Sequence, residues 1–168
     1  MPRSASLRWF GLACLVVVLD QVSKHAVRQA LAFGQSVRVT SFFDLVLVFN
    51  PGAAFSFLSD ASGWQREFFV CVALLASGFV SYLIVRHRGK VLFSFALALI
   101  LGGALGNLVD RVVFGAVVDF LHFHVAQYYW PAFNLADSAI TCGAALLIWE
   151  SFFDRQPRRG PAEPTGRQ

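Results

Sequence analysis

Four long apolar stretches dominate the hydrophobic pattern of this chain, and charged or glycine-rich residues interrupt them. They cover residues 7–25, 67–86, 91–109 and 136–153. A helix of about 20 apolar residues crosses the hydrocarbon core of a bilayer, so each stretch has roughly the length of a membrane span. The pattern therefore predicts four transmembrane helices joined by short connections.

Residues 36–58 follow a different pattern, in which β-branched and aromatic residues are interspersed with polar ones. The run 42–49 favours short strands, and Asn50-Pro51-Gly52 favours a turn after them. The stretch is too polar and too interrupted to cross a bilayer. We expect one or two strands here, forming a small sheet outside the membrane on the side opposite the N-terminus.

The composition agrees with a membrane protein. Hydrophobic residues make up 57% of the 168 residues and charged residues only 14%, whereas soluble domains hold about 25% charged residues. The fold class predicted is an all-α polytopic membrane protein with a small extramembrane sheet. We expect one domain over residues 1–154 and a disordered cytoplasmic tail over 155–168, which is rich in Pro and Arg.

The charges are distributed unequally between the two ends of the predicted helices. Most Lys and Arg residues lie near the termini and in the connection 86–90, whereas most acidic residues lie at the other end. Cytoplasmic loops carry the excess of cations, so we expect both termini in the cytoplasm and the acidic face outside. The net charge of +4 suits a membrane surface, and no nucleic-acid partner is expected.

The cysteines and histidines do not predict a metal site. Cys14, Cys71 and Cys142 lie in three different apolar stretches, without CxxC spacing, so neither a disulfide framework nor a zinc site is expected. Free cysteine is typically a small buried residue, and we expect all three to be buried. His122 and His124 would share one face of a strand, but no HExxH motif or further ligand cluster accompanies them.

Three aspartates between residues 102 and 138 are the main candidates for chemistry. Asp110 and Asp137 lie at the ends of apolar stretches, and Asp119 lies inside an apolar run after Gly115. A carboxylate beside hydrocarbon costs about 2.5–3.5 kcal/mol, so a chain that keeps several in one region is expected to use them. An acid in the surroundings of Asp119 should have a raised pKa unless it finds a partner.

Small and polar residues accompany Asp110 at helical spacing. Gly103, Gly106 and Asn107 share one face of the third predicted helix with Asp110, and the glycines there would let a neighbouring helix approach closely. Arg111 follows at once, where it could neutralise Asp110 or reach lipid phosphates.

Two further pairs of polar residues have both a structural and a functional interpretation. Asn134 suits the N-cap of the fourth predicted helix and Asp137 its N3 position, so capping is the alternative to catalysis there. Asp20 and Lys24 are spaced for an i, i+4 ion pair, which either caps the membrane end of the first helix or serves the site directly.

The chemistry of paired carboxylates favours peptide hydrolysis. Two carboxylates in a partly dry site share one proton, so that one deprotonates water while the other polarises a carbonyl, as in aspartic proteases. A proton relay in a small transporter and capping in a non-catalytic membrane assembly protein are the alternatives. An Asp→Asn exchange separates these interpretations, because it preserves shape and capping but removes the carboxylate chemistry.

From about Leu7 to Phe153 the chain resembles the lipoprotein signal peptidases (signal peptidase II), which are bacterial membrane aspartic peptidases. Five motifs in order carry the resemblance, and together they are far more specific than any one alone. They are Asp20-Gln21-Val22-Ser23-Lys24, Asn50-Pro51-Gly52-Ala53-Ala54-Phe55, residues 102–111 (GGALGNLVDR), Val118-Asp119-Phe120 and Phe133-Asn134-Leu135-Ala136-Asp137-Ser138.

The resemblance implies a catalytic pair, Asp119 and Asp137. The positions that it implies for substrate binding or support of the site are Asp20, Lys24, Asn50, Gly52, Phe55, Asn107, Asp110, Arg111, Asn134 and Ala136. It also implies four transmembrane helices with a small extracytoplasmic β-cradle and a short periplasmic helix, which we assign to residues 36–58 and 110–131.

The implied reaction is removal of the signal peptide from prolipoproteins, by cleavage just before a cysteine that carries diacylglycerol, with no metal or organic cofactor. The implied partners are prolipoproteins with diacylglyceryl-cysteine and membrane lipids, and we expect a monomer. The implied location is the bacterial cytoplasmic (inner) membrane, with both termini cytoplasmic and the active site at the periplasmic face.

Overall fold

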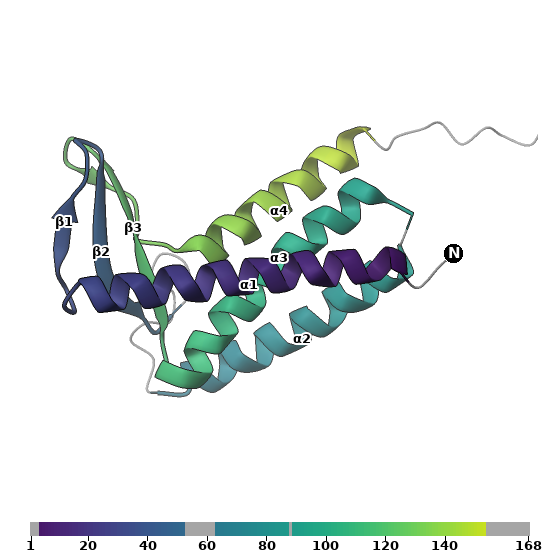
Figure 1. The fold of residues 1–168 in the computed structure, drawn as a ribbon, viewed down its shortest axis with the longest axis horizontal. Coiled ribbons are helices and arrows are strands. Elements are labelled where there is room, and N and C mark those ends of the chain that lie inside the picture. Colours follow the sequence, from purple (N-terminus) through teal and green to yellow (C-terminus); the bar gives the residue numbers. More distant parts are fainter. Residues whose placement is uncertain (1–3, 53–62, 88, 154–168) are drawn as a thin grey trace, which may run out of the picture.

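Four long helices form the bundle in the computed structural model, which describes residues 4–52, 63–87 and 89–153 (Figure 1). They are α1 (Ser4–Ala30), α2 (Gln65–Arg86), α3 (Val91–Phe114) and α4 (Leu135–Phe153). All four are long and apolar enough to cross a membrane, which confirms the four predicted helices. Both α1 and α3 continue past the predicted ends at residues 25 and 109, because hydropathy marks the apolar span and not the end of the helix.

α3 is the central helix of the bundle. Over half of its apolar window is buried (56%), compared with 17% for α2 and for α4, and α3 packs against each of the other three helices. Its Leu97 and Leu101 join Trp9 of α1 and Ile84 of α2 in one hydrophobic cluster. The outward faces of α2 and α4 remain apolar, as expected for helices that contact lipid.

Glycines bring the backbones of neighbouring helices together. A methyl group added at Gly102 would lie 2.8 Å from the backbone oxygen of Ala13 in α1, and one at Gly143 would lie 2.6 Å from that of Ala96 in α3. Both obstacles are backbone atoms, which cannot move aside as a flexible side chain can. Small residues at these positions are therefore required for the observed interhelical distances.

Replacing Gly143 by alanine is expected to lower the free energy of unfolding by about 1–3 kcal/mol, the usual cost of overpacking. The measurement is the melting temperature of the purified protein in detergent. Gly78→Ala is the matched control, because a methyl group at Gly78 in α2 would meet nothing within 4 Å. Equal melting temperatures for the two variants would contradict the close contact of α3 with α4.

A four-stranded antiparallel sheet lies across one end of the bundle (Figure 1). Its strands, in spatial order, are β1 (Ser36–Arg38), β2 (Phe43–Asn50), β3 (Val117–Val125) and β4 (Tyr128–Tyr129). β1 and β2 confirm the strands predicted in the first part of residues 36–58. Residues 53–58 of that prediction lie outside the described residues, as does the predicted tail from residue 155 onward.

The region 110–131 corrects one expectation, because the described structure contains strands there and not the short periplasmic helix. α3 ends at Gly115, whose φ of +77° is a left-handed conformation that glycine adopts readily. β3 then runs antiparallel to β2, with Asp119 opposite Val48. The β-branched and aromatic residues of 117–125 are typical of a strand, whereas the expected periplasmic helix rests on the family resemblance alone.

The sheet is attached to the bundle through a second hydrophobic cluster. Val27 near the end of α1 packs with Leu47 of β2 and with Val118 and Phe120 of β3. Val118 is completely buried. This packing fixes β3, and with it Asp119, against the end of the helix bundle.

The expectation that the cysteines are buried was wrong. Cys14, Cys71 and Cys142 are free, as predicted, but all three are exposed on the surfaces of α1, α2 and α4. The prediction assumed that an apolar side chain avoids the surface. That assumption fails for a helix whose outward face meets lipid, where a small apolar side chain loses nothing by exposure.

Candidate active site

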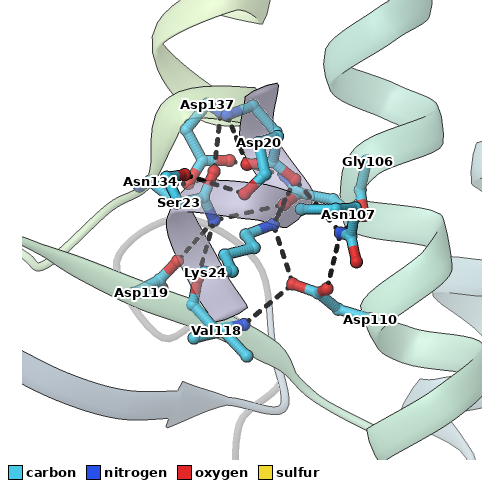
Figure 2. Close-up of polar contacts among 12 residues, drawn as sticks. Asp20, Ser23, Lys24, Gly106, Asn107, Asp110, Val118, Asp119, Asn134 and Asp137 are labelled. Carbon is cyan, nitrogen blue, oxygen red and sulfur yellow. Dashed lines mark hydrogen bonds and ion pairs between the residues drawn. The ribbon is translucent and has the colours of Figure 1, made fainter. Parts of the chain in front are cut away.

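Asp119 and Asp137 come together where the sheet meets the first turn of α4 (Figure 2). Asp119 lies on β3 with only 2% of its surface exposed, whereas Asp137 is partly exposed. Both side chains line one cavity of about 730 Å³. Two acids predicted from separate motifs therefore share one site, one of them almost dry and the other accessible from the cavity.

Asn134 connects the two carboxylates. Its Nδ2 donates to Asp119 Oδ1 at 2.7 Å, and its Oδ1 accepts the backbone N–H of Asp137 at 2.9 Å. Asp137 Oδ2 in turn accepts the backbone N–H of Asn134 at 3.2 Å, which completes a reciprocal capping pair. Capping and a role in the site are thus not alternatives, because Asn134 caps α4 with its side-chain oxygen and holds Asp119 with its side-chain nitrogen.

Two other asparagines donate hydrogen bonds to the carboxylates. Asn107 Nδ2 on α3 donates to Asp137 Oδ1 at 2.7 Å, and Asn50 Nδ2 at the end of β2 donates to Asp119 Oδ2 at 3.2 Å. Asparagines from β2, from α3 and from the residue just before α4 thus orient the pair, whose two members lie on β3 and α4.

Burial and the neighbouring Asp137 carboxylate raise the pKa of Asp119 to about 7, with burial the larger cause. The hydrogen bonds from Asn50 and Asn134 act in the opposite direction, because they stabilise the ionised form. A carboxyl group with this pKa retains a proton in a large fraction of molecules near neutral pH. The pair can therefore hold one proton between its two members.

Lys24 is buried behind this pair and binds two further acids. Its Nζ lies 2.8 Å from Asp20 Oδ2 and 2.7 Å from Asp110 Oδ2. The first contact confirms the predicted i, i+4 pair in α1. The second differs from one of the two roles considered for Arg111, neutralisation of Asp110, because in the described structure the cation paired with Asp110 comes from another helix.

Arg111 lines the cavity. Its Nη2 donates to the backbone oxygen of Gly52 at 3.0 Å, and its guanidinium lies 5.0 Å from the centre of the Phe69 ring. Consecutive residues of a helix do not face each other, which explains why adjacency in sequence was misleading. Arg111 therefore joins α3 to the turn after β2.

Gly106 and Ala136 hold Asp20 in place. Asp20 Oδ1 accepts the backbone N–H of Ala136 at 2.9 Å, an amide of the first turn of α4 that favours negative charge. A methyl group at Gly106 would lie 2.6 Å from Asp20 Oδ2. The predicted importance of Ala136 thus rests on its backbone, and that of Gly106 on the space it leaves for a carboxylate.

The predicted site residues divide into two layers. Those that line the cavity are Asn50, Gly52, Asn107, Arg111, Asp119 and Asp137. Those that lie behind them and support them are Asp20, Lys24, Asp110, Asn134 and Ala136. Phe55 lies outside the described residues. In the described part of the chain, no group of three or more His, Cys, Asp or Glu side chains is placed to hold a metal ion.

Sequence reasoning missed several contributors to the site. Gln21 Nε2 donates to Asp110 Oδ1 at 2.9 Å and to the backbone oxygen of Gly106 at 3.1 Å, and a polar residue next to Asp20 in an apolar helix was the available signal. Thr141 lines the cavity and could have been found four residues after Asp137, on the same helix face. The segment 130–133 also lines the cavity, and its aromatic residues Trp130 and Phe133 were the available signal.

Together these features define a class of protein: a helical membrane protein whose paired carboxylates lie in a cavity at one end of the bundle. This is the geometry of an aspartic hydrolase that works at a membrane surface.

Comparison with known proteins identifies the family. The model of the signal peptidase (SPase) II family matches residues 12–153. The lipoprotein signal peptidase of Cupriavidus pinatubonensis is 58% identical over 146 residues, which cover 87% of this chain and 83% of that protein. The lipoprotein signal peptidase of Azoarcus sp. is 52% identical over 163 residues, which cover 96% and 93%. The chain belongs to the signal peptidase II family of aspartic peptidases.

Solved structures agree with this placement. A bacterial membrane enzyme determined by the in meso method at 2.3 Å resolution is 30% identical to this chain, with a TM-score of 0.79 over 94% of both chains. A second bacterial membrane enzyme, determined at 1.9 Å resolution, is 31% identical with a TM-score of 0.76 over 88% of this chain and 94% of the other. The four-helix bundle with its small sheet is thus a bacterial membrane fold.

Proposed function

We propose that Asp119 and Asp137 carry out the reaction of this signal peptidase, which is the removal of signal peptides from prolipoproteins. The bond cleaved is the one just before a cysteine that carries diacylglycerol. The observation that supports the assignment is the shared cavity, in which two carboxylates from different elements are held by one asparagine. The names of the relatives, lipoprotein signal peptidases, support the class of substrate.

The different surroundings of the two acids assign their roles. Asp137, partly exposed and bound by Asn107, is the ionised member that takes a proton from water as the oxygen adds to the scissile carbonyl carbon. Asp119, with its raised pKa, gives its proton to the carbonyl oxygen. When the C–N bond breaks, Asp137 passes its proton to the leaving nitrogen and Asp119 regains one from the hydroxyl group.

The lining of the cavity suits a substrate that enters from the membrane. It includes α4 residues from Asp137 to Cys142, a rise of about 7 Å along the helix, together with residues of β2 and the segment 130–133. The lipidated cysteine would place its acyl chains beside α4 and its peptide bond at the two aspartates. With the termini in the cytoplasm, as the charge distribution favours, the site lies at the periplasmic face of the inner membrane.

The test uses the purified protein in detergent with a prolipoprotein that carries diacylglyceryl-cysteine. The control is the same precursor without the lipid, and a second control adds a metal chelator. Release of the signal peptide from the lipidated precursor alone, unaffected by the chelator, is the expected result. Equal cleavage of both precursors would overturn the proposed role of the lipid, and cleavage of neither would overturn the proposed function. We also propose that one domain, residues 1–154, acts as a monomer, which its mass in detergent would check.

The cleavage rate is expected to fall as the pH rises above about 7, by about tenfold per unit once Asp119 is largely ionised. The sign follows from the raised pKa of Asp119, which means that the pair keeps its proton below this pH and loses it above. The measurement is the dependence of kcat/KM on pH between 5.5 and 9. In Asn50→Ala the decline should move to higher pH, because the hydrogen bond from Asn50 lowers the pKa of Asp119. A rate that stays constant up to pH 9 would contradict the role of Asp119 as the proton donor.

A further inference from the structure

Lys24 lies outside the cavity but forms the centre of a closed hydrogen-bonding arrangement behind it (Figure 2). Lys24 as a whole is 2% exposed, and its ammonium group lies near three oxygens: Asp20 Oδ2 at 2.8 Å, Asp110 Oδ2 at 2.7 Å and Asn107 Oδ1 at 2.9 Å. An ammonium group has three protons to donate and accepts none. Each proton of Lys24 therefore has one acceptor, and two of these three acceptors are carboxylates.

The third acceptor, Asn107, connects Lys24 to the site. Its amide group can present either its oxygen or its nitrogen to a neighbour. Lys24 can only donate, so it requires the oxygen of Asn107. The nitrogen of Asn107 must then face the other way, where it donates to Asp137 Oδ1 at 2.7 Å. The orientation of this amide is thus coupled to the charge on Lys24.

Asn134 acts in the same direction, but more weakly. Its Nδ2 also donates to Asn107 Oδ1, at 3.1 Å. The two protons of that nitrogen are shared with Asp119 Oδ1 at 2.7 Å and with the backbone oxygen of Val118 at 3.2 Å. Because Asn134 Nδ2 has two protons for three acceptors, its hydrogen bond to Asn107 Oδ1 is the weaker constraint. Lys24, with one proton for each acceptor, is the stronger constraint on the Asn107 amide.

We propose that Lys24 is a positioning residue for catalysis, which keeps Asp137 in its reactive form by fixing the orientation of the Asn107 amide. With the amide in place, Asp137 Oδ1 receives an N–H and has no need of a proton. If the amide turned, its oxygen would face Asp137 Oδ1, and two acceptors would meet unless that carboxyl group became protonated. A protonated Asp137 cannot take a proton from water. This inference rests on the role proposed above for Asp137.

Other charged groups surround this connection within the described residues, and they would act on any pH dependence. Lys24 is bound by Asp20 from α1 and Asp110 from α3. Asp137 is close enough to interact electrostatically with Arg111 from α3 and Asp119 from β3. Among the charged side chains of the described residues, only Lys24 donates a hydrogen bond to Asn107 Oδ1, so the orientation of this amide tests the role of Lys24.

The experiment compares Lys24→Met, Asn107→Ala and the double variant with the unchanged protein, by kcat and KM for cleavage of a lipidated prolipoprotein between pH 5 and 9. In Lys24→Met we expect kcat at pH 7 to fall at least tenfold, KM to stay within about twofold, and the acid side of the profile to move up by about one pH unit. In the Asn107→Ala background the same substitution should have almost no further effect on kcat, because Lys24 acts through Asn107.

Lys24→Met leaves two buried acids without their cation, so Lys24→Met combined with Asp110→Asn serves as a second variant if the first does not fold. The proposal would be overturned if Lys24→Met lowered kcat by the same factor with and without Asn107. The proposal would also be overturned if the acid side of the pH profile of Lys24→Met lay at the same pH as in the unchanged protein. Asp137→Asn, measured alongside, separates failure of the proposed function from failure of the positioning role. Normal turnover of Asp137→Asn would refute the proposed function. If Asp137→Asn is inactive but Lys24→Met lowers kcat equally with and without Asn107, only the positioning role of Lys24 is refuted.

Discussion

Asp137→Asn and Asp119→Asn are each expected to lower kcat for signal-peptide release by about 10³–10⁴-fold, which is the upper range for loss of a general acid or base. Asparagine at position 137 still accepts the backbone N–H of Asn134, and so preserves the capping pair. It cannot take a proton from water. Asparagine at position 119 cannot give a proton to the carbonyl oxygen, and its amide also faces the Nδ2 donors of Asn50 and Asn134.

The matched control for these variants is Asp44→Asn, which changes an acid of β2 that lies outside the cavity lining. Its turnover should equal that of the unchanged protein. All variants are compared at equal amounts of folded protein, judged by thermal unfolding in detergent. Near-normal turnover in either Asp119→Asn or Asp137→Asn would assign that residue to capping or packing, which is what a non-catalytic assembly protein would show.

The proton-relay alternative meets a geometric objection in the structure. A relay across a membrane needs ionisable groups along the length of the bundle. The four acids of the site, Asp20, Asp110, Asp119 and Asp137, instead gather at one end, next to the sheet. The arrangement suits a reaction at the membrane surface.

The sequence predicted the helices well, because each apolar stretch is long and its limits are marked by charges. It predicted the site residues for a related reason: an acid such as Asp119 in an apolar run is costly, and the cost draws attention to it. Family resemblance then grouped the supporting residues. Hydropathy and motifs together therefore predicted the spans and the charged and asparagine residues of the cavity, but not most of its apolar lining.

Pairing across the bundle could not be predicted in the same way. Asp110 has Arg111 beside it in sequence but binds Lys24 of α1, and only the distance and rotation between α1 and α3 decide this. β3 was not predicted because it forms by pairing with β2, more than sixty positions earlier in the sequence. A strand held by such a distant partner is not marked by its local sequence alone. The loop 130–133 enters the cavity wall through its pairing with Leu121 of β3, again a contact between distant segments.

Asn134→Ser and Asn134→Leu are expected to separate the two roles of the residue that connects the site. Serine is a good N-cap but offers no nitrogen to Asp119, so the serine variant should keep α4 capped and lose the 2.7 Å hydrogen bond. We expect its kcat to fall about 10²-fold or more, with the free energy of unfolding lowered by about 1–3 kcal/mol for the buried acceptors left unpaired. Leucine also removes the cap, which adds about 1 kcal/mol.

The measurements for these two variants are the melting temperature in detergent and the cleavage rate at several pH values. Loss of the Asn134 donor should raise the pKa of Asp119 further, since that hydrogen bond lowers it, and the decline in rate at high pH should move upward in both variants. If Asn134→Ser lost stability but kept its rate and its pH profile, Asn134 would be a helix cap alone. If Asn134→Ser and Asn134→Leu both lost activity while their melting temperatures were equal, catalysis would need the hydrogen bond between Asn134 and Asp119. Capping stabilises the fold but does not affect the proton held at Asp119.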